Sequence, residues 1–213
     1  MLTLGIDTAE PIGGVSLFEE GVCAEERLME APLQHAERLI PLVRELVEGS
    51  SRTLQEVACV SVNLGPGSFT GLRIGLATGK GLCHASGAAL VGVDGTVAYR
   101  SRVPEERRVC VVLRSRRDLF YVRWFAGDRP KGTTCLIRER SLIERLRQEK
   151  RELTLVGSGA EAIREHVVDH ALLRIGPEPA LRPSPLTVAR IGATQVGDSL
   201  YELEPIYIEP VFE

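Results

Sequence analysis

The residues best suited to chemistry gather at one glycine-rich turn, Gly65-Pro66-Gly67-Ser68. The apolar run before this turn predicts a buried strand at residues 57–62, and Ser68 is a suitable N-cap for a helix that follows. A strand, a glycine turn and a helix N-terminus together present backbone N–H groups to an anion. The turn therefore indicates phosphate binding.

A second candidate for phosphate chemistry is the pair Asp7-Thr8, which follows a short strand at residues 2–6. Two more strands are expected at 13–18 and 22–28, separated by a hairpin signal. Actin-like ATPase folds begin in this antiparallel way, and their first Asp approaches phosphate and magnesium. Asp in a turn also forms local hydrogen bonds without any ligand. The candidate remnant phosphate-binding residues are Asp7, Thr8, Gly65, Gly67 and Ser68.

Two common phosphate signatures do not fit. A P-loop needs Gly where Ile74 stands and Ser or Thr where Gly81 stands. The dinucleotide fingerprint G-x-G-x-x-G would need its third Gly one residue before Gly71. Because Asp94 ends the next expected strand, where a ribose-binding carboxylate would stand, a dinucleotide site remains an alternative.

Other reactive side chains lack the partners that catalysis or metal binding would need. His166 and His170 are four residues apart, a spacing that places both on one helix face, but no third ligand is evident. Ser68 and Thr70 have no recognisable base, and neither G-x-S-x-G nor H-E-x-x-H occurs. The sequence thus predicts no catalytic residue and no metal site. A basic turn, Arg114 to Arg117, is either a solvated loop or a phosphate contact.

Three glycines, Gly71, Gly75 and Gly79, recur every four residues in the helix after the turn and so share one face. Each costs about 1 kcal/mol relative to Ala in a helix interior, which indicates that another backbone packs closely there. That backbone belongs either to this chain or to a second protein. The amphipathic pattern at residues 33–48, interrupted by Pro41, predicts a neighbouring helix.

The composition is that of a globular protein, with 44% hydrophobic and 26% charged residues among 213. A net charge of −3 argues against RNA binding by a broad basic surface of this chain alone. Five cysteines without a C-x-x-C pair suggest free thiols in a reducing compartment. No targeting segment and no run of about 20 apolar residues is evident, so we expect a cytoplasmic protein.

The elements repeat in order along the chain. Strands, a helix, a strand, a Gly turn and a helix occur in residues 1–99 and again in residues 100–213, with the charged segment 100–108 as the expected linker. This repetition predicts an α/β protein of two similar lobes, each a mixed sheet with flanking helices. Ser184 and Pro185 should begin a last helix, and the tail 204–213 should be an edge strand at best.

Three segments, LGIDTAE at 4–10, HAERLIPLV at 35–43 and above all GPGSFTGLRIGLATGKGL at 65–82, resemble the bacterial TsaB (YeaZ) family. The resemblance covers the first lobe from end to end, and the second lobe mainly in layout. It implies a two-lobed actin-like fold (ASKHA, ribonuclease H-like) without catalysis of its own. No cofactor is implied, although a remnant ATP site is left open, and no protease activity is expected from this glycoprotease-like group.

The resemblance also implies partners. Family members bind the catalytic TsaD subunit through first-lobe helices, and the ATPase TsaE joins the pair to make threonylcarbamoyladenosine in tRNA. Alone they form homodimers, and tRNA is met only through the complex. The expected interface residues are Leu39, Val43, Gly71, Leu72, Gly75, Leu76 and Gly79. On this view Gly75→Leu would leave the monomer folded and abolish partner binding.

The chain departs from the family pattern at Arg114, Leu119 and Glu209, where the family usually has Asp, Glu and Arg. Actin-like kinases use the Asp of the second lobe for metal and phosphate. Arg114 therefore argues against autonomous ATP turnover. An actin-like ATP-dependent phosphotransferase, or another nucleotide-binding enzyme, remains the alternative function.

Overall fold

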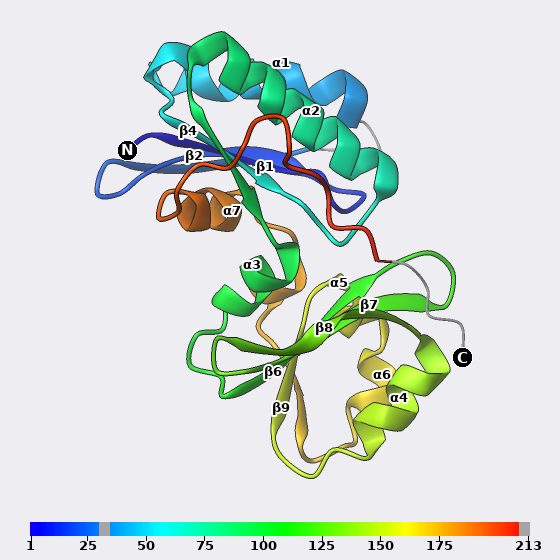
Figure 1. Ribbon diagram of the computed structural model, residues 1–213. Helices are drawn as coiled ribbons and strands as arrows, with labels where there is room; N and C mark the ends of the chain where they lie inside the picture. The colour runs from blue at the N-terminus through cyan, green and yellow to red at the C-terminus, as the bar shows by residue number, and fades with distance from the viewer. Residues whose placement is uncertain (30–34, 209–213) are drawn as a thin grey trace. The chain divides into compact units, whose positions relative to one another are not determined.

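A computed structural model describes residues 1–29 and 35–208 of the chain, which divides into two units (Figure 1). Unit 1 comprises Met1–Ala98 and Ser184–Ile206, and unit 2 comprises Tyr99–Pro183 and Tyr207–Glu213. The first division lies where the sequence places it, between residues 98 and 100. The second differs from the expected lobe 100–213, because Ser184–Ile206 packs with the first unit.

The sheet of unit 1 has five strands in the order β3-β2-β1-β4-β5. Its first three strands are antiparallel neighbours, whereas β1, β4 and β5 run parallel. The strands predicted at 2–6, 13–18, 22–28 and 57–62 are confirmed to within two residues, and the strand expected directly before Asp94 is confirmed as well. Their bounds are β1 Thr3–Asp7, β2 Gly14–Glu19, β3 Cys23–Leu28, β4 Cys59–Asn63 and β5 Ala89–Val93.

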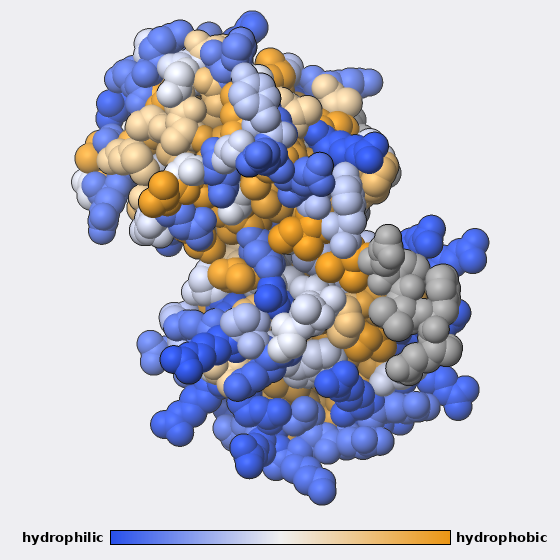
Figure 2. All heavy atoms as spheres, in the orientation of Figure 1, coloured by the Kyte–Doolittle hydropathy of each residue, from blue (hydrophilic) through white to orange (hydrophobic). Residues whose placement is uncertain are grey.

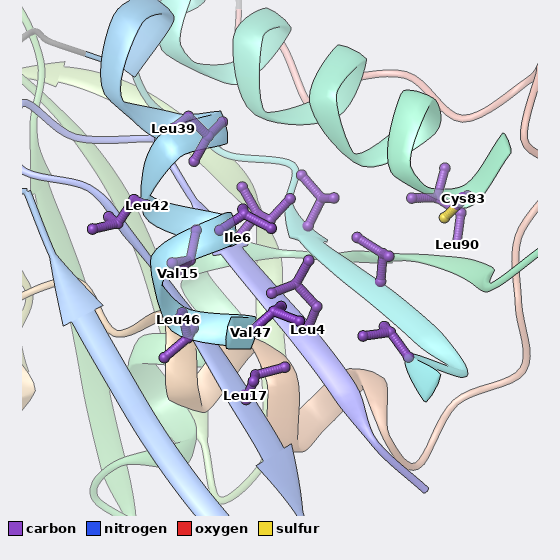
Figure 3. Packing of buried hydrophobic residues seen from close by; sticks show 14 of the residues in the cluster. Leu4, Ile6, Val15, Leu17, Leu39, Leu42, Leu46, Val47, Cys83 and Leu90 are labelled. Atoms are coloured by element: carbon purple, nitrogen blue, oxygen red, sulfur yellow. The ribbon is translucent and has the colours of Figure 1, made fainter. Parts of the chain in front are cut away.

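Helices cover both faces of this sheet. Figure 1 shows α1 (His35–Gly49) beside α2 (Phe69–Ser86) on one face and α7 (Pro185–Gly192) on the other. In Figure 3 leucines of α1 point at the apolar side chains of β1 and β2, for example Leu39 and Leu46 toward Ile6 and Leu17. The start of the helix predicted at 33–48 lies outside the described residues. A short 3-10 helix, η1, spans Leu54–Glu56.

α7 completes unit 1 because its buried face meets the strands closely. Ser184 caps it by accepting a hydrogen bond from the Thr187 amide (3.2 Å), which confirms the predicted start. The Ser61 hydroxyl of β4 donates to the Val188 carbonyl at 2.9 Å. A Cβ at Gly5 of β1 would lie 2.9 Å from the Ala189 Cβ. Segment 184–206 therefore belongs with the first sheet.

The chain after α7 follows the edge of β5. The Asp198 amide donates to the Leu90 carbonyl at 2.7 Å, and its carboxylate accepts from the Gly92 amide at 2.8 Å. Further on, the Ile206 amide donates to the Leu64 carbonyl at 2.8 Å. No strand is assigned at 204–208, and the rest of the predicted edge strand lies outside the described residues.

Unit 2 repeats the same sheet design. When the strands are numbered within each unit, both sheets have the order 3-2-1-4-5. In both, the first three strands are antiparallel neighbours, and the fourth and fifth run parallel to the first. The strand bounds are β6 Arg108–Arg114, β7 Leu119–Ala126, β8 Arg129–Arg138, β9 Leu153–Val156 and β10 Leu173–Ile175. α3 Gly95–Ser101 passes from unit 1 into unit 2, and the other helices of unit 2 are α4 Glu139–Arg147, α5 Ser158–Ala162, α6 Arg164–Val167 and η2 Glu178–Leu181. The predicted α/β design of two mixed sheets with flanking helices is confirmed.

Two local predictions in this region were wrong. The spacing of Ser141 and Glu144 predicts a capping box, but none forms, because α4 begins at Glu139 and Ser141 lies in its first turn. The expected linker 100–108 includes the end of α3, and its Arg100 is only 3% exposed. The Arg100 guanidinium donates to the carbonyls of Gly127 (2.8 Å), Val103 (2.6 Å) and Glu106 (3.0 Å). Because Arg100 is buried and forms these hydrogen bonds, the chain at the start of unit 2 is held in place and is not a free linker.

Candidate functional site: the helix pair of unit 1

The glycine turn is held by side chains at both of its ends. The Asn63 side-chain oxygen accepts from the Gly65 amide at 2.8 Å, and the Gly65 carbonyl accepts from the Gly95 amide at 2.8 Å. Gly65 has φ +106°, a conformation that L side chains rarely adopt. Ser68 is the N-cap of α2, as predicted, and its hydroxyl accepts from the Gly71 amide at 3.2 Å.

The turn between β1 and β2 packs directly against this loop. The Ser68 amide donates to the Ala9 carbonyl at 2.7 Å, and a Cβ at Gly67 would collide with that same carbonyl. The Thr8 hydroxyl donates to the Gly71 carbonyl at 2.7 Å, while the Asp7 carboxylate accepts from the Ala9 amide at 3.1 Å. Asp7 and Thr8 are 2% and 0% exposed.

The structure thus brings the five predicted phosphate-binding residues together, but four of them, Asp7, Thr8, Gly65 and Ser68, form hydrogen bonds with neighbouring residues of this chain. The amides of Ser68 and Gly71, which an anion at the N-terminus of α2 would need, already donate to this chain. The fit to a phosphate group is therefore poor in this arrangement. A phosphate role for Asp7, Thr8, Gly65, Gly67 and Ser68 stays a prediction.

Asp94 also has a structural task. Its carboxylate accepts from the amide and from the hydroxyl of Thr96, at 2.8 and 2.6 Å. This arrangement satisfies donors in the first turn of α3, which begins at Gly95. The carboxylate that the dinucleotide alternative would use for a ribose is thus turned toward its own chain.

The glycine face of α2 packs on its own sheet. A Cβ at Gly71 would collide with the Thr8 carbonyl, a Cβ at Gly75 with the Thr8 hydroxyl, and a Cβ at Gly79 would lie 2.6 Å from Val62. The glycine pattern was compatible with packing on this chain or on a second protein. The structure has the first, because the glycine face lies against Thr8 and Val62 of the same chain.

This packing concerns the residues of the expected interface. Leu39, Val43, Leu72 and Leu76 are at most 6% exposed, and the three glycines face the sheet. In the chain alone these residues are largely turned into unit 1, although Val43 also lines a groove described below, and their direct contact with a partner stays a prediction. The expectation that Gly75→Leu leaves the monomer folded fails, because the new side chain would overlap Thr8.

The outward face of the two helices carries other residues, which the sequence analysis did not select. Ile40 of α1 is 47% exposed and Phe69 of α2 is 54% exposed. The Arg73 guanidinium lies over the Phe69 ring at 3.8 Å from its centroid. Ala77 and Gly81 continue the exposed face of α2, and a Cβ at Gly81 would meet no atom within 4 Å. Orange patches among blue ones cover unit 1 in Figure 2.

A largely apolar groove of about 380 Å³ adjoins this face. It is lined by Ile40, Val43, Arg44, Val47, Glu48, Arg52, Thr53, Leu54 and Leu82. The amphipathic spacing of α1 could not identify Ile40, since it shares the i, i+3, i+4 spacing of the buried residues. We call Ile40, Phe69, Arg73, Ala77 and Gly81, together with the groove, the helix-pair face.

The histidine pair in unit 2 does not form the expected arrangement. α6 ends at Val167, so His166 and His170 do not share a helix face. His166 lies 3.6 Å from the Glu139 carboxylate, and a ring nitrogen of His170 lies 3.2 Å from the Arg147 carbonyl. Within residues 1–29 and 35–208, no group of three His, Cys, Asp or Glu residues is placed to hold a metal ion.

The positions that depart from the family pattern lie at the turn after β6. Arg114 is exposed, and its amide donates to the Ser158 hydroxyl at 3.2 Å. Arg117 adopts φ 53°, and Leu119 is half-buried at the start of β7. Glu209 lies outside the described residues.

The thiols are poor nucleophiles. Burial raises the pKa of Cys59 and of Cys83 from 9.0 to about 11. Burial also raises the pKa of Cys110 and of Cys135. These four side chains therefore stay protonated at neutral pH.

The described helices include none that is long and apolar enough to cross a bilayer.

The sequence of the chain is similar to those of known proteins. Residues 29–127 match the family described as TsaD, tRNA N6-adenosine threonylcarbamoyltransferase. The TsaB protein of Escherichia coli, named for tRNA threonylcarbamoyladenosine biosynthesis, is 28% identical over 173 residues, 76% of this chain and 73% of that protein. A tRNA N6-adenosine threonylcarbamoyltransferase of Solidesulfovibrio magneticus is 38% identical over 109 residues, 44% of this chain but only 29% of that enzyme.

Solved structures share the whole fold. YeaZ from Pseudomonas aeruginosa superposes with a TM-score of 0.77 at 22% identity, covering 97% of this chain and 99% of that one. A Bacteroides thetaiotaomicron protein described as having an actin-like ATPase fold matches with a TM-score of 0.50 at 12% identity, covering 85% and 92%. The two mixed sheets are therefore those of the actin-like fold. With the glycine-rich motif of 65–82 and the match to E. coli TsaB, these findings confirm the resemblance to the TsaB (YeaZ) family.

Proposed function

We propose that this chain is a non-catalytic partner subunit in tRNA threonylcarbamoyladenosine biosynthesis, and that it binds a TsaD-like catalytic subunit through the helix-pair face. The similarity to the TsaB protein of E. coli, named for this biosynthesis, supports the role in this modification. The binding of TsaD, the joining of a TsaE-like ATPase and the homodimer formed by the chain alone are our proposals.

The observation that carries the proposal is the exposed apolar character of two adjacent helices. Ile40 and Phe69 are each about half exposed, although both belong to helices whose other faces are buried. Ala77 and Gly81 leave no bulk on the outer surface of α2, so a helix of another protein can approach its backbone closely. An apolar centre with a charged rim from Arg44, Glu48 and Arg73 is the composition of a protein interface.

The seven buried residues first assigned to the interface act indirectly in this proposal. Gly71, Gly75 and Gly79 let α2 lie directly on β1 and β4, and Leu72, Leu76, Leu39 and Val43 fill the space beneath the two helices. Together they fix the height and spacing of α1 and α2. The outer face then keeps one shape, and a preorganised surface binds with less loss of conformational entropy.

The absence of catalysis is proposed from the chemistry of the side chains. The carboxylate of Asp7 and the amides of the glycine turn serve the fold, and Cys59, Cys83, Cys110 and Cys135 remain thiols at neutral pH. We therefore assign the chemistry to the TsaD-like subunit, with no catalytic residue, cofactor or metal in this chain. Contact with tRNA is made in the complex.

Isothermal titration calorimetry tests the proposal. Titrating the purified chain with the TsaD-like protein of its own organism should give binding at one site per chain. A second titration with ATP and magnesium should give no heat of binding. Magnesium-dependent ATP binding that Asp7→Ala weakens, with no binding of the TsaD-like protein, would instead establish the actin-like phosphotransferase.

A further inference from the structure

Charge is distributed very unevenly between the two units. Unit 2 contains 19 of the 26 Lys and Arg residues but 14 of the 29 Asp and Glu residues, a formal net charge of +5. Unit 1 contains the other 7 basic and 15 acidic residues, a net charge of −8. The overall charge of −3 therefore conceals a basic unit. Figure 2 shows blue, hydrophilic side chains over most of the visible surface of unit 2.

Part of this charge lines a groove of about 380 Å³. Its lining comes from the start of β6 and from the end of α4 with the residues that follow, and consists of Arg108, Arg145, Gln148, Glu149, Lys150 and Arg151. Every lining side chain is polar or charged. A protein interface of ordinary composition would have an apolar centre, which this groove lacks.

Most of the cations in the groove are not neutralised. Arg108 pairs with Glu149 at 3.0 Å. In the part of the chain that the structure describes, no carboxylate lies within ion-pair distance of Arg145, Lys150 or Arg151. The groove therefore has a net charge of +3 from its four cations and one carboxylate.

An aromatic side chain orients one of these cations. The Arg145 guanidinium lies over the Trp124 ring, 3.8 Å from its centroid, and Trp124 is half-buried against the core of unit 2. Lys131 of β8 is paired with Trp124 across the antiparallel strands, so both side chains lie on the same face of the sheet. Lys131 is exposed and extends the positive surface beyond the groove.

We propose that this basic groove of unit 2 binds the phosphate backbone of RNA, and that it contributes a contact to tRNA when the chain is in its complex. The identification of the RNA as tRNA rests on the proposed function. Unpaired cations beside an aromatic ring suit an RNA backbone, because phosphates release counterions when Lys and Arg neutralise them. Planar guanidinium groups also bind two phosphate oxygens at once. Three unpaired cations give only weak binding by themselves, so the contact adds to those of the partner subunit.

The variant that tests this proposal is Lys150→Gln with Arg151→Gln, since both side chains are exposed and unpaired. The matched control is Arg164→Gln with Arg182→Gln. It removes the same charge from unit 2, but from residues paired with Glu161 and Glu178. Fluorescence anisotropy with a labelled, unmodified tRNA transcript then measures affinity of the complex with the TsaD-like protein over a series of salt concentrations.

We expect the groove variant to lower the affinity for tRNA roughly tenfold or more at about 0.1 M salt. The slope of log K against log salt should fall by about 2, one for each lost phosphate contact. The control should change neither quantity by more than about twofold. Equal effects in both variants, or no effect of the groove variant, would overturn the proposal. If an acidic peptide, added at the same concentration of negative charge, displaces the tRNA from the groove, the groove binds an acidic protein instead and the proposal is overturned.

Two further measurements separate this proposal from the proposed function. Calorimetry should give the groove variant an unchanged affinity for the TsaD-like protein, because the groove is not part of the helix-pair face. If the chain does not bind the TsaD-like protein at all, the proposed function fails. The tRNA titration of the chain alone at low salt then still decides the inference, since only an intact groove should bind.

Discussion

Gly75 illustrates how a missing side chain fixes a helix on a sheet. A Cβ at this position would overlap the Thr8 hydroxyl, which itself bonds to the Gly71 carbonyl. Six residues further along the same helix, a Cβ at Gly81 would meet nothing within 4 Å. The two glycines have the same conformational cost in a helix but opposite surroundings. They form a matched pair of test sites.

We predict that Gly75→Ala lowers the free energy of unfolding by about 1–3 kcal/mol, because it overpacks the contact between α2 and Thr8. Gly81→Ala should raise the same quantity by up to about 1 kcal/mol, because Ala favours the helix and nothing opposes it. Urea unfolding followed by circular dichroism measures both. A Gly75→Ala protein as stable as the wild type would show that α2 does not lie as closely on the β1–β2 turn as described.

The buried thiols predict how stability depends on pH. The pKa values of Cys59 and Cys83 are about 11 in the folded chain and 9.0 for an exposed thiol. The unfolded chain therefore loses these protons first as pH rises. The stabilisation is fully present below pH 9 and is lost between about pH 9 and 11, by about 1.4 kcal/mol per pH unit for each thiol.

Urea unfolding from pH 7.5 to 11 measures this dependence. Between pH 9 and 11, a variant with Cys59→Ala and Cys83→Ala should lose less free energy of unfolding than the wild type, whatever its stability at pH 7.5. Equal losses in the two proteins would contradict the burial of these thiols.

Among the elements, the helix pair α1 and α2 separates a structural face from a binding face. We predict that Ile40→Glu weakens binding of the TsaD-like protein at least about tenfold, because a charge placed at the apolar centre of an interface is left without a partner. The free energy of unfolding should change by no more than about 0.5 kcal/mol, since Ile40 is 47% exposed. Calorimetry and urea unfolding test the two statements.

The control for this variant is Val168→Glu, an apolar residue of unit 2 that is 66% exposed and is not part of the helix-pair face. It should leave the affinity for the TsaD-like protein unchanged. If both variants bind with wild-type affinity, the partner does not use the helix-pair face.

Strands and long helices could be predicted from the sequence where one pattern dominates. The apolar runs before the glycine turn and before Asp94 each had only one reading, and Ser68 and Ser184 mark helix starts by their own chemistry. The short α3 was missed because Gly95 begins it and charged residues follow it. The burial of Arg100 was missed because its acceptors are backbone carbonyls, and these leave no trace in side-chain spacing.

The candidate site was predicted less well than the fold. A row of glycines establishes that something packs closely, but the sequence does not say whether that is Thr8 or another protein. Ile40 and Phe69 look like core residues in the sequence, because their exposure depends on how the helices are rotated on the sheet. The charge contrast, by comparison, is already present in the predicted lobes 1–99 and 100–213, with net charges of −6 and +3, and the assignment of Ser184–Ile206 to unit 1 increases it to −8 and +5.

For the whole molecule, the return of the chain to unit 1 has a consequence for folding. Residues 1–98 alone lack α7, which covers one face of their sheet. We predict that this fragment does not unfold cooperatively in urea. A protein in which Ser184–Ile206 is joined to residues 1–98 by a flexible Gly/Ser linker should do so, because it restores contacts such as the Ser61 to Val188 hydrogen bond. Equal cooperativity of the two proteins would favour a lobe that ends at residue 99.

The measurement that tests the central claim most directly is reconstitution of the tRNA modification. The purified chain is mixed with the TsaD-like and TsaE-like proteins of its organism, threonylcarbamoyl-adenylate or its precursors, and unmodified tRNA, and each component is omitted in turn. We predict that threonylcarbamoyladenosine formation is lost when this chain is omitted, and that the chain alone neither modifies tRNA nor turns over ATP. Modification that proceeds without the chain, or ATP turnover by the chain alone, would contradict its role as a non-catalytic partner subunit.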